Sequence, residues 1–374
     1  MKIVFLTGTR ADYGKIKPLI NILSKNNKFE VSIVVCGMHL LEKYGSTYLE
    51  VEKDNLAKIY KISHDSYIDN DIAYAVSNNT QKISELISEL KTDLLMIHGD
   101  RAEALSGAIA ALSKNIIIGH IEGGEVSGTI DEMFRHAISK LSHIHFVSNT
   151  KAKERLLRMG EIERNIHIIG SPDLDVMISD LPKIERVKKR YEITFKKYGI
   201  LLFHPVTTEL KNLRDETLEI CRAIIQSKKD FIVIFPNNDP GSEIIIESYK
   251  TIFKGQECIK ILPSMRFEYF LSLLKHSEFI LGNSSCGVRE APFYGLPSIN
   301  LGTRQNMRAN SKSILNINCN EKDILNAVKK CPTINEPASN EFGDGKSAEK
   351  FLLVLKDLNL EDISIQKSIN DSYI

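Results

Sequence analysis

Short apolar runs alternate with segments of helical spacing along most of the chain, beginning with an apolar run at 2–7 and a helical pattern at 15–26. Over the first half, this alternation predicts strands at 29–36, 94–97, 116–118, 144–148 and 166–169, and helices at 81–90, 102–113, 131–141 and 151–159. The stretch 39–80 is less regular, and we expect it to carry a mobile loop. Strands joined through helices run parallel in one sheet, and such sheets bind ligands beyond the carboxyl ends of their strands.

The same alternation returns in the second half, after a charged run at 181–198 that fits a linker or the first helix of a new domain. It predicts strands at 198–203, 231–235, 259–262, 279–281 and 298–301, and helices at 210–226, 267–275 and 288–294. A last apolar helix at 348–358 is expected to return to the first domain, followed after 360 by a polar tail that frays. The pattern therefore predicts an α/β protein of two doubly wound, Rossmann-like domains that face each other across a cleft. We place the first domain at 1–178 together with 345–374, and the second at 179–344.

The composition narrows the class of protein. With 374 residues the chain is too long for one ordinary core, and 43% hydrophobic with 26% charged residues is typical of a globular protein. A formal net charge of +1 argues against binding to nucleic acid or to an anionic membrane. The six cysteines are far apart and form no C-x-x-C pair, as expected of reduced thiols. No apolar run is long enough for a membrane span or a signal peptide, so we expect a soluble, cytoplasmic protein.

Three carboxylates form the strongest candidate for a catalytic site. Asp100 follows the apolar run at 94–97 and Glu122 follows the run at 116–118, so the two are expected side by side if these strands are parallel neighbours. Asp131 comes at the start of the next helix, after a glycine-rich loop. The plainer alternatives are that Asp131 only caps the helix and that Glu122 is a solvated loop residue. Their joint placement favours one acidic crevice.

Two glycine-containing loops are candidates for binding an anion such as a phosphate. The first, at 8–14, joins the first strand to the first helix, and Arg10 in this loop can bond a phosphate through two guanidinium nitrogens. The second, at 282–285, opens a helix with Ser284 and Ser285. Their hydroxyls and backbone N–H groups can bond a diphosphate at the positive end of the helix dipole. An ordinary surface arginine and a simple serine N-cap are the alternatives.

Three more residues of the second half fit the same kind of site. Glu290 can accept hydrogen bonds from a ribose diol, as acidic residues do in other nucleotide sites. His204 follows a strand, where it can contact phosphate or sugar or transfer a proton near neutral pH. Arg304 is a further candidate for clamping an anion.

A metal site is not predicted. His143 and His145 share one face of a strand, but this follows from the alternation of the strand itself. No third ligand follows at a suitable spacing.

Six segments occur in the order in which one enzyme family carries them, and they span positions 8–305. They are GTRADYGKIKPL, MIHGDRAEAL, HIEGGEVSGTIDEMFRHAISKLSHIH, GSPDLDVM, FHPVTTE and GNSSCGVREAPFYGLPSINLGTRQ. Together they closely resemble the hydrolysing UDP-N-acetylglucosamine 2-epimerases of bacterial sialic acid synthesis. The non-hydrolysing epimerases carry a Pro-Glu pair after their opening GTR, where this chain has Ala11 and Asp12.

The resemblance implies a GT-B-like fold and conversion of UDP-N-acetylglucosamine and water into N-acetylmannosamine and UDP. It implies elimination to 2-acetamidoglucal followed by hydration, with no cofactor, in a homodimer or homotetramer whose partner molecule is a UDP-sugar. It puts the catalytic carboxylates on Asp100, Glu122 and Asp131. It puts the contacts to UDP and sugar on Arg10, Lys15, Arg101, His204, Ser284, Ser285, Gly287, Glu290 and Arg304.

Removal of the C2 proton of the sugar needs a strong carboxylate base, and three acids in one dehydrated cleft are expected to raise one another's pKa. We assign Asp100 and Asp131 to the proton transfers at C2, and Glu122 to the water at C1. One alternative keeps this chemistry on UDP-2,4-diacetamido-2,4,6-trideoxy-glucose, in a legionaminic acid type of pathway. Others are a GT-B glycosyltransferase and a non-catalytic sensor of nucleotide sugars, and the three carboxylates argue against both.

Overall fold

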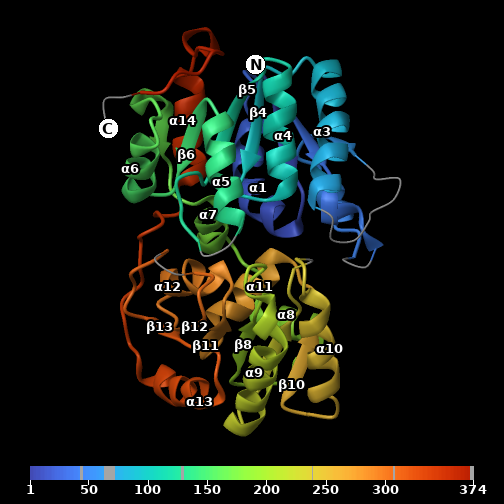
Figure 1. Ribbon diagram of the computed structural model, residues 1–374, viewed down its shortest axis with the longest axis vertical. Helices are drawn as coiled ribbons and strands as arrows, with labels where there is room; N and C mark the ends of the chain where they lie inside the picture. Colours follow the sequence, from blue (N-terminus) through green and yellow to red (C-terminus); the bar gives the residue numbers. More distant parts are fainter. Residues whose placement is uncertain (43–44, 63–71, 128–129, 238, 306–307, 371–374) are drawn as a thin grey trace. The chain divides into compact units, whose positions relative to one another are not determined.

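The protein is described by a computed structural model that covers residues 1–42, 45–62, 72–127, 130–237, 239–305 and 308–370. The chain forms two compact units, each built on one parallel sheet (Figure 1). Unit 1 comprises Met1–Glu125, Asp131–Ser179 and Phe342–Ile374, and unit 2 comprises Val126–Ile130 and Asp180–Glu341. The prediction of two doubly wound α/β sheets is confirmed.

Unit 1 holds seven strands in the order β3-β2-β1-β4-β5-β6-β7, all parallel to their neighbours. The strands are β1 Lys2–Thr7, β2 Glu30–Val35, β3 Lys58–Lys61, β4 Leu94–His98, β5 Ile117–Ile121, β6 Ile144–Val147 and β7 Ile166–Ile168. The helices are α1 Arg10–Ser24, α2 Tyr48–Asp54, α3 Ile72–Glu89, α4 Ala102–Ser113, α5 Ile130–Leu141, α6 Thr150–Arg158, α7 Pro172–Ile178 and α14 Ser347–Asp357, with 3-10 turns η1 Gly37–Leu40, η3 Glu163–Asn165 and η7 Leu360–Asp362. The strand order reverses between β1 and β4, which is where sheets of this kind bind ligands.

The strands of unit 1 are continuous apolar runs because helices cover both faces of the sheet. In β1, Phe5 belongs to the core formed with α1 and α14, whereas Val4 and Leu6 belong to the core formed with α3 and α4. Phe351 of α14 lies against Phe5 and Phe146, with ring centroids 6.4 and 4.7 Å apart. Figure 1 shows α14, in red, among the helices of unit 1 although its sequence lies near the far end of the chain.

Unit 2 holds six parallel strands in the order β10-β9-β8-β11-β12-β13. The strands are β8 Gly199–Leu202, β9 Phe231–Ile234, β10 Ile259–Leu262, β11 Phe279–Gly282, β12 Ser298–Leu301 and β13 Ile314–Ile317. The helices are α8 Ile184–Tyr191, α9 Leu213–Ser227, α10 Ser242–Ile252, α11 Phe267–Lys275, α12 Glu290–Phe293 and α13 Glu321–Lys330, with 3-10 turns η4 Leu210–Asn212, η5 Ser285–Gly287 and η6 Cys331–Thr333. The charged run at 181–198 thus supplies the first helix of unit 2.

The first helix begins earlier than the sequence predicts. The pattern places it at 15–26, but α1 starts at Arg10 because the Thr9 hydroxyl accepts a hydrogen bond from the Asp12 N–H at 3.2 Å and caps the helix. Arg10 and Lys15 therefore lie on a helix, and the prediction that Arg10 belongs to a loop is wrong.

The sequence pattern also misses several regular elements. The stretch 39–80 contains α2, β3 and the start of α3, and unit 2 contains α10, β13 and α13 in addition to the predicted elements. Part of the expected mobile loop, residues 63–71, lies outside the described residues. The predicted fraying of the tail is wrong as far as Asn370, whose N–H donates to the Gly160 carbonyl at 2.9 Å.

Candidate active site

Asp100 and Glu122 lie directly beyond the carboxyl ends of β4 and β5, which are neighbouring strands. His98 pairs with Ile121 in the register of these strands, and the Gly99 N–H donates to the Ile121 carbonyl at 3.0 Å. Gly99 (φ +73°) and Glu122 (φ +65°) both adopt the left-handed conformation. This conformation is uncommon for a glutamate and persists where the surrounding structure fixes it. The prediction that these two strands are parallel neighbours is confirmed.

Arg135 links Asp100 to α5. Its side chain is buried, and its guanidinium donates to Asp100 Oδ2 and, at 3.0 Å, to the Glu125 carbonyl. Burial opposes the charge on this guanidinium, but the charges of Asp100, Glu125 and Asp131 outweigh burial and raise the pKa of Arg135. Asp131 lies in the first turn of α5, so Asp100 and Asp131 interact with the same buried cation.

Glu122 is 4% exposed, so the alternative of a solvated loop residue is wrong. Its Oε1 accepts a hydrogen bond from Ser171 Oγ at 2.5 Å, and its Oε2 lies 3.4 Å from His98 Nε2. On the other side of the imidazole, His98 Nδ1 lies 3.6 Å from Asp12 Oδ1 on α1. One buried histidine therefore lies between two carboxylates, one from α1 and one from the end of β5.

The charges of Asp12, His98 and Glu122 stabilise one another. Burial alone would lower the pKa of His98, but Glu122 and Asp12 outweigh it and raise the pKa to about 9. Burial would raise the pKa of Asp12, but His98, the charge of Arg101 and the Thr9 hydroxyl lower it. At neutral pH, His98 is therefore a cation and Asp12 an anion.

The basic candidates of unit 1 lie close to the ends of β1 and β4. Arg10 opens α1 and Arg101 immediately precedes α4, so they follow the two strands between which the sheet order reverses. Arg10 Nη2 lies 2.9 Å from Glu50 Oε1, with 20% of the Arg10 side chain exposed. Lys15 Nζ lies 3.4 Å from Oδ2 of the buried Asp173, so Lys15 connects α1 to α7. The two arginines are placed where parallel sheets bind ligands.

In unit 2, Asn283 joins the ends of two neighbouring strands. Its side-chain amide accepts from the His204 N–H at 2.7 Å and donates to the His204 carbonyl at 2.8 Å. Its own carbonyl accepts from Arg304 Nη1 at 3.2 Å and from Gln305 Nε2 at 3.0 Å. The Asn237 N–H donates to His204 Nδ1 at 3.1 Å, so the neutral imidazole carries its proton on Nε2. Asn283 thus fixes His204 and Arg304 in one place.

The segment after β11 is not the regular helix that the sequence predicts at 288–294. Ser284 precedes a single 3-10 turn, η5, and α12 has only four residues, from Glu290 to Phe293. Pro292 supplies no backbone N–H to a longer helix, and the turn ends at Gly295 in a left-handed conformation. Such short elements have little macrodipole. An anion here would be bound by individual N–H groups and by the hydroxyls of Ser284 and Ser285.

Gly282 and Gly287 allow this segment to lie closer to the neighbouring strands than a residue with a Cβ would permit. Gly282 has φ +138°, and a Cβ at this position would lie 2.0 Å from the Leu202 carbonyl oxygen. A Cβ on Gly287 would lie 2.8 Å from Ser298 Oγ. Glu290, which follows them, is 2% exposed. The adjacent strands β8, β11 and β12 are thus followed or flanked by His204, Ser284, Ser285, Gly287, Glu290 and Arg304.

Comparison with known proteins identifies the family to which this chain belongs. A family model described as UDP-N-acetylglucosamine 2-epimerase matches residues 21–356. The chain belongs to the UDP-N-acetylglucosamine 2-epimerase family. It is 45% identical to a UDP-N-acetylglucosamine 2-epimerase of Neisseria meningitidis serogroup B, with 99% of each chain covered. It is 34% identical to a UDP-N,N'-diacetylbacillosamine 2-epimerase (hydrolyzing) of Legionella pneumophila, with 98% of each chain covered.

Among solved structures, the UDP-GlcNAc 2-epimerase of Methanocaldococcus jannaschii in complex with UDP-GlcNAc and UDP superposes with a TM-score of 0.82. The match covers 95% of this chain and 99% of that one at 24% identity, and it confirms the GT-B-like fold of the family. No helix in the described part of this epimerase family member has the length and apolar character of a membrane span.

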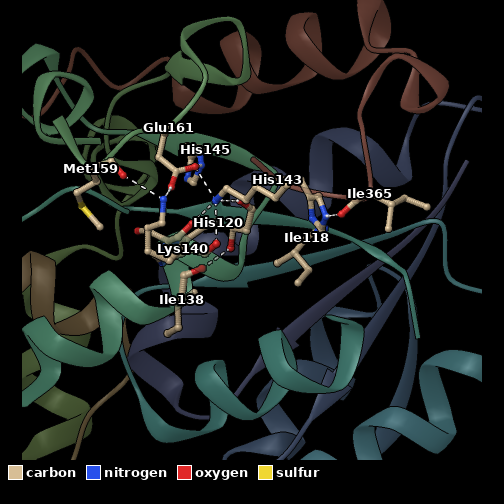
Figure 2. A network of polar contacts seen from close by, with 12 residues as sticks. Ile118, His120, Ile138, Lys140, His143, His145, Met159, Glu161 and Ile365 are labelled. Atoms are coloured by element: carbon tan, nitrogen blue, oxygen red, sulfur yellow. Dashed lines mark hydrogen bonds and ion pairs between the residues drawn. The ribbon is translucent and has the colours of Figure 1, made fainter. Parts of the chain in front are cut away.

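In this member of the family, His143 and His145 have structural partners. His145 Nε2 donates to Glu161 at 2.9 Å, and His143 Nδ1 accepts from the Ile118 N–H at 3.1 Å (Figure 2). Within the described ranges, no three His, Cys, Asp or Glu side chains gather as a metal site would require.

Three residues of the candidate site were not assigned from the sequence. His98 and Arg135 hold the carboxylates of unit 1, and Asn283 holds His204 and Arg304 in unit 2. A histidine that ends a buried strand directly before Gly-Asp is a usable signal for His98, and Arg135 is one helical turn from Asp131. The role of Asn283 depends on long-range contacts that the sequence does not display.

Proposed function

We propose that the protein hydrolyses UDP-N-acetylglucosamine with inversion at C2, giving N-acetylmannosamine and UDP. The observation that carries this proposal is the placement of Asp100 and Glu122 at adjacent strand ends, each beside a buried cation. The 45% identity to the Neisseria meningitidis UDP-N-acetylglucosamine 2-epimerase supports the choice of substrate. The product would feed sialic acid synthesis, as in the enzymes that the sequence resembles.

The proposed reaction has two stages. A carboxylate base removes the proton at C2 while the C1–O bond to UDP breaks, which leaves 2-acetamidoglucal with a C1=C2 double bond. The hydroxyl of water then bonds to C1, and a proton is delivered to C2 from the opposite face. Carbon is neither oxidised nor reduced overall, so the reaction requires no redox cofactor.

In this scheme, Asp100 and Asp131 exchange protons at C2. They share Arg135, so gain of a proton by one carboxylate strengthens the interaction of the other with the guanidinium. Glu122 assists the water at C1, where its contacts with Ser171 and His98 hold its carboxylate in one orientation. General-base help of this kind contributes about 10²- to 10⁴-fold in rate.

Unit 2 residues would hold the UDP group. Nε2 of His204 carries a proton that can bond a phosphate oxygen, and Arg304 and the hydroxyls of Ser284 and Ser285 can stabilise the leaving diphosphate. Glu290 would accept from the ribose diol. From unit 1, binding would be supported by Arg10, Arg101 and Lys15, the last through its contact with Asp173. Gly287 would allow close approach of the ligand.

The main alternative keeps the chemistry and changes the sugar. The 34% identity to the Legionella pneumophila UDP-N,N'-diacetylbacillosamine 2-epimerase (hydrolyzing) supports a 2,4-diacetamido-2,4,6-trideoxy sugar as the competing substrate. A GT-B glycosyltransferase would need an acceptor, so turnover of a UDP-sugar in water alone, if observed, would argue against that function.

Proton NMR in heavy water tests the proposal. The protein is incubated with UDP-N-acetylglucosamine, and we expect UDP together with N-acetylmannosamine that carries deuterium at C2. Release of UDP with protium retained at C2 would contradict the elimination. If UDP-N-acetylglucosamine does not react, the 2,4-diacetamido sugar is tested under the same conditions. Turnover of that sugar alone would show that it is the substrate in place of UDP-N-acetylglucosamine.

A variant separates catalysis from binding. Asp100→Asn should lower turnover by about 10²-fold or more while UDP still binds. Asp357→Asn, at an exposed position of α14, is the matched control and should retain full activity. Retained turnover in Asp100→Asn would remove this carboxylate from the mechanism.

A further inference from the structure

Helix α5 carries Asp131 and Arg135, and its apolar contacts with the core are few: Ile138 is buried there, and the partly buried Leu141 packs against it. Of its three buried residues, Arg135, Ile138 and Ser139, only Ile138 is apolar. The neighbouring α4 buries four alanines instead. Because apolar burial is the usual source of helix attachment, the position of α5 depends on its polar contacts.

The C-terminal end of α5 is held by one lysine from the distant tail of the chain. Lys367 Nζ donates to the carbonyls of Ser139 (3.0 Å), Lys140 (2.9 Å) and Ser142 (2.5 Å). The last carbonyls of a helix have no partner within the helix, and a cation there also interacts favourably with the helix dipole. Lys367 thus satisfies three acceptors at once.

A buried carboxylate anchors this lysine. Glu161 Oε2 lies 2.5 Å from Lys367 Nζ, and the same carboxylate accepts from Lys140 Nζ at 2.8 Å and from His145 Nε2 at 2.9 Å. Burial favours the neutral carboxyl, but the hydrogen bond from His145 and the ammonium groups of Lys367 and Lys140 outweigh it and lower the pKa of Glu161 to about 2. The carboxylate is therefore ionised throughout the neutral range.

The tail is fixed on both sides of Lys367. The Ile365 carbonyl accepts from His143 Nε2 at 3.2 Å, and the Asn370 N–H donates to the Gly160 carbonyl at 2.9 Å. The Lys367 side chain is only 19% exposed. The lysine is thus held in place by backbone contacts of its own segment.

A second contact leads from the same end of α5 toward Asp100. His120 of β5 donates through Nε2 to the Gly99 carbonyl at 2.8 Å, so its Nδ1 accepts from the Ser139 hydroxyl at 3.0 Å. Burial lowers the pKa of His120 to about 3, so the imidazole stays neutral and keeps this arrangement of donor and acceptor. Ser139 therefore bonds both Lys367 and the histidine that supports the turn before Asp100.

We propose that Lys367 is a positioning residue, which joins the last turn of α5 to Glu161. It thereby fixes the helix so that Asp131 and Arg135 keep their positions relative to Asp100. This inference rests on the proposed function for its catalytic consequence. The attachment of α5 itself does not depend on that function and is measured separately.

The test compares Lys367→Met with Lys188→Met in the full chain. Lys188 of unit 2 also donates from Nζ to a backbone carbonyl, that of Phe195 at 2.7 Å, within its own segment of the chain. Hydrogen exchange read by mass spectrometry should show α5 amides exchanging about tenfold faster or more in Lys367→Met and unchanged in Lys188→Met. Turnover of UDP-N-acetylglucosamine, counted per UDP-binding site, should fall about 10- to 100-fold in Lys367→Met. KM and the Kd for UDP should stay within about twofold.

Unchanged exchange of α5 in Lys367→Met would overturn the proposal. So would faster exchange with unchanged kcat per site, since the lysine would then be structural only. If the wild-type protein does not turn over the sugar nucleotide, the proposed function fails, while the exchange experiment still decides whether Lys367 holds α5. If Lys367→Met does not fold, Lys367→Arg serves instead. Its planar guanidinium keeps the charge but does not reproduce three bonds from one ammonium, so a smaller change of the same kind is expected.

Discussion

Replacement of His98 by glutamine should change how the stability of unit 1 depends on pH. His98 lies between Asp12 and Glu122, with ring nitrogens 3.6 and 3.4 Å from their carboxylate oxygens, and its side chain is 6% exposed. Glutamine has a similar reach and its amide N–H can donate to one of these carboxylates, but it carries no charge. His98→Gln therefore removes the cation while most of the packing remains.

The magnitude follows from the pKa of His98, which the fold raises from the ordinary 6.5 to about 9. The fold favours the protonated form, so the stabilising effect is complete below pH 6.5 and is lost as the pH rises toward 9. A shift of this size corresponds to roughly 3 kcal/mol in total, of which about 2 kcal/mol is lost between pH 7 and pH 9. His98→Gln should show no such loss over this interval.

Scanning calorimetry is the suitable assay, because it can resolve separate transitions of two units and because the chain has no tryptophan for fluorescence. The difference in unfolding free energy between wild type and His98→Gln should shrink by about 2 kcal/mol between pH 7 and pH 9. His276→Gln, at an exposed histidine of unit 2, should keep the pH dependence of the wild type. Parallel curves for wild type and His98→Gln would refute the assignment of His98 as a buried cation.

Two further substitutions test the supports of the site. Arg135→Met leaves a carboxylate without its buried cation, so unit 1 should lose roughly 3–5 kcal/mol in a denaturant titration and turnover in the NMR assay should fall below detection. Gly282→Ala, at φ +138° beside a backbone carbonyl, should destabilise unit 2 by several times the ~1–2 kcal/mol expected for Gly255→Ala, where φ is +77° and an added Cβ meets nothing within 4 Å. Equal midpoints for the two alanine variants would contradict the close approach at Gly282.

The sequence predicts the central strands well because these strands are buried on both faces and so appear as continuous apolar runs. The strands that it misses, β3 and β13, are the outermost strands of their sheets. β3 consists of Lys58–Lys61, whose two lysines are exposed and whose Ile and Tyr are half-buried. Because half of its residues are charged and exposed, β3 lacks the apolar run that marks the central strands. Position at the edge alone is not sufficient, because the outermost strands β7 and β10 are predicted from their apolar runs.

The candidate site is predictable to the extent that it depends on strand order. Because β4 and β5 are neighbours, Asp100 and Glu122 had to lie close together, and the sequence is sufficient for that inference. The partners of these carboxylates are different. Ser171 is 49 residues away from Glu122, Asp12 is 86 residues away from the His98 that it shares with Glu122, and nothing in the local pattern selects them. Side-chain partners at such separations depend on the packing of whole elements.

The structure also changes the electrostatic basis of the proposed chemistry. The sequence argument expects Asp100, Glu122 and Asp131 to raise one another's pKa through like charge. The fold instead supplies a cation to each: Arg135 interacts with Asp100 and Asp131, and His98 interacts with Glu122. A nearby cation favours the ionised form of a carboxylate, so these contacts oppose the effect of like charge. Under the proposed function, stabilisation of the departing diphosphate then becomes the main driving force for removing the C2 proton, so loss of a phosphate-binding side chain should lower kcat as well as raise KM.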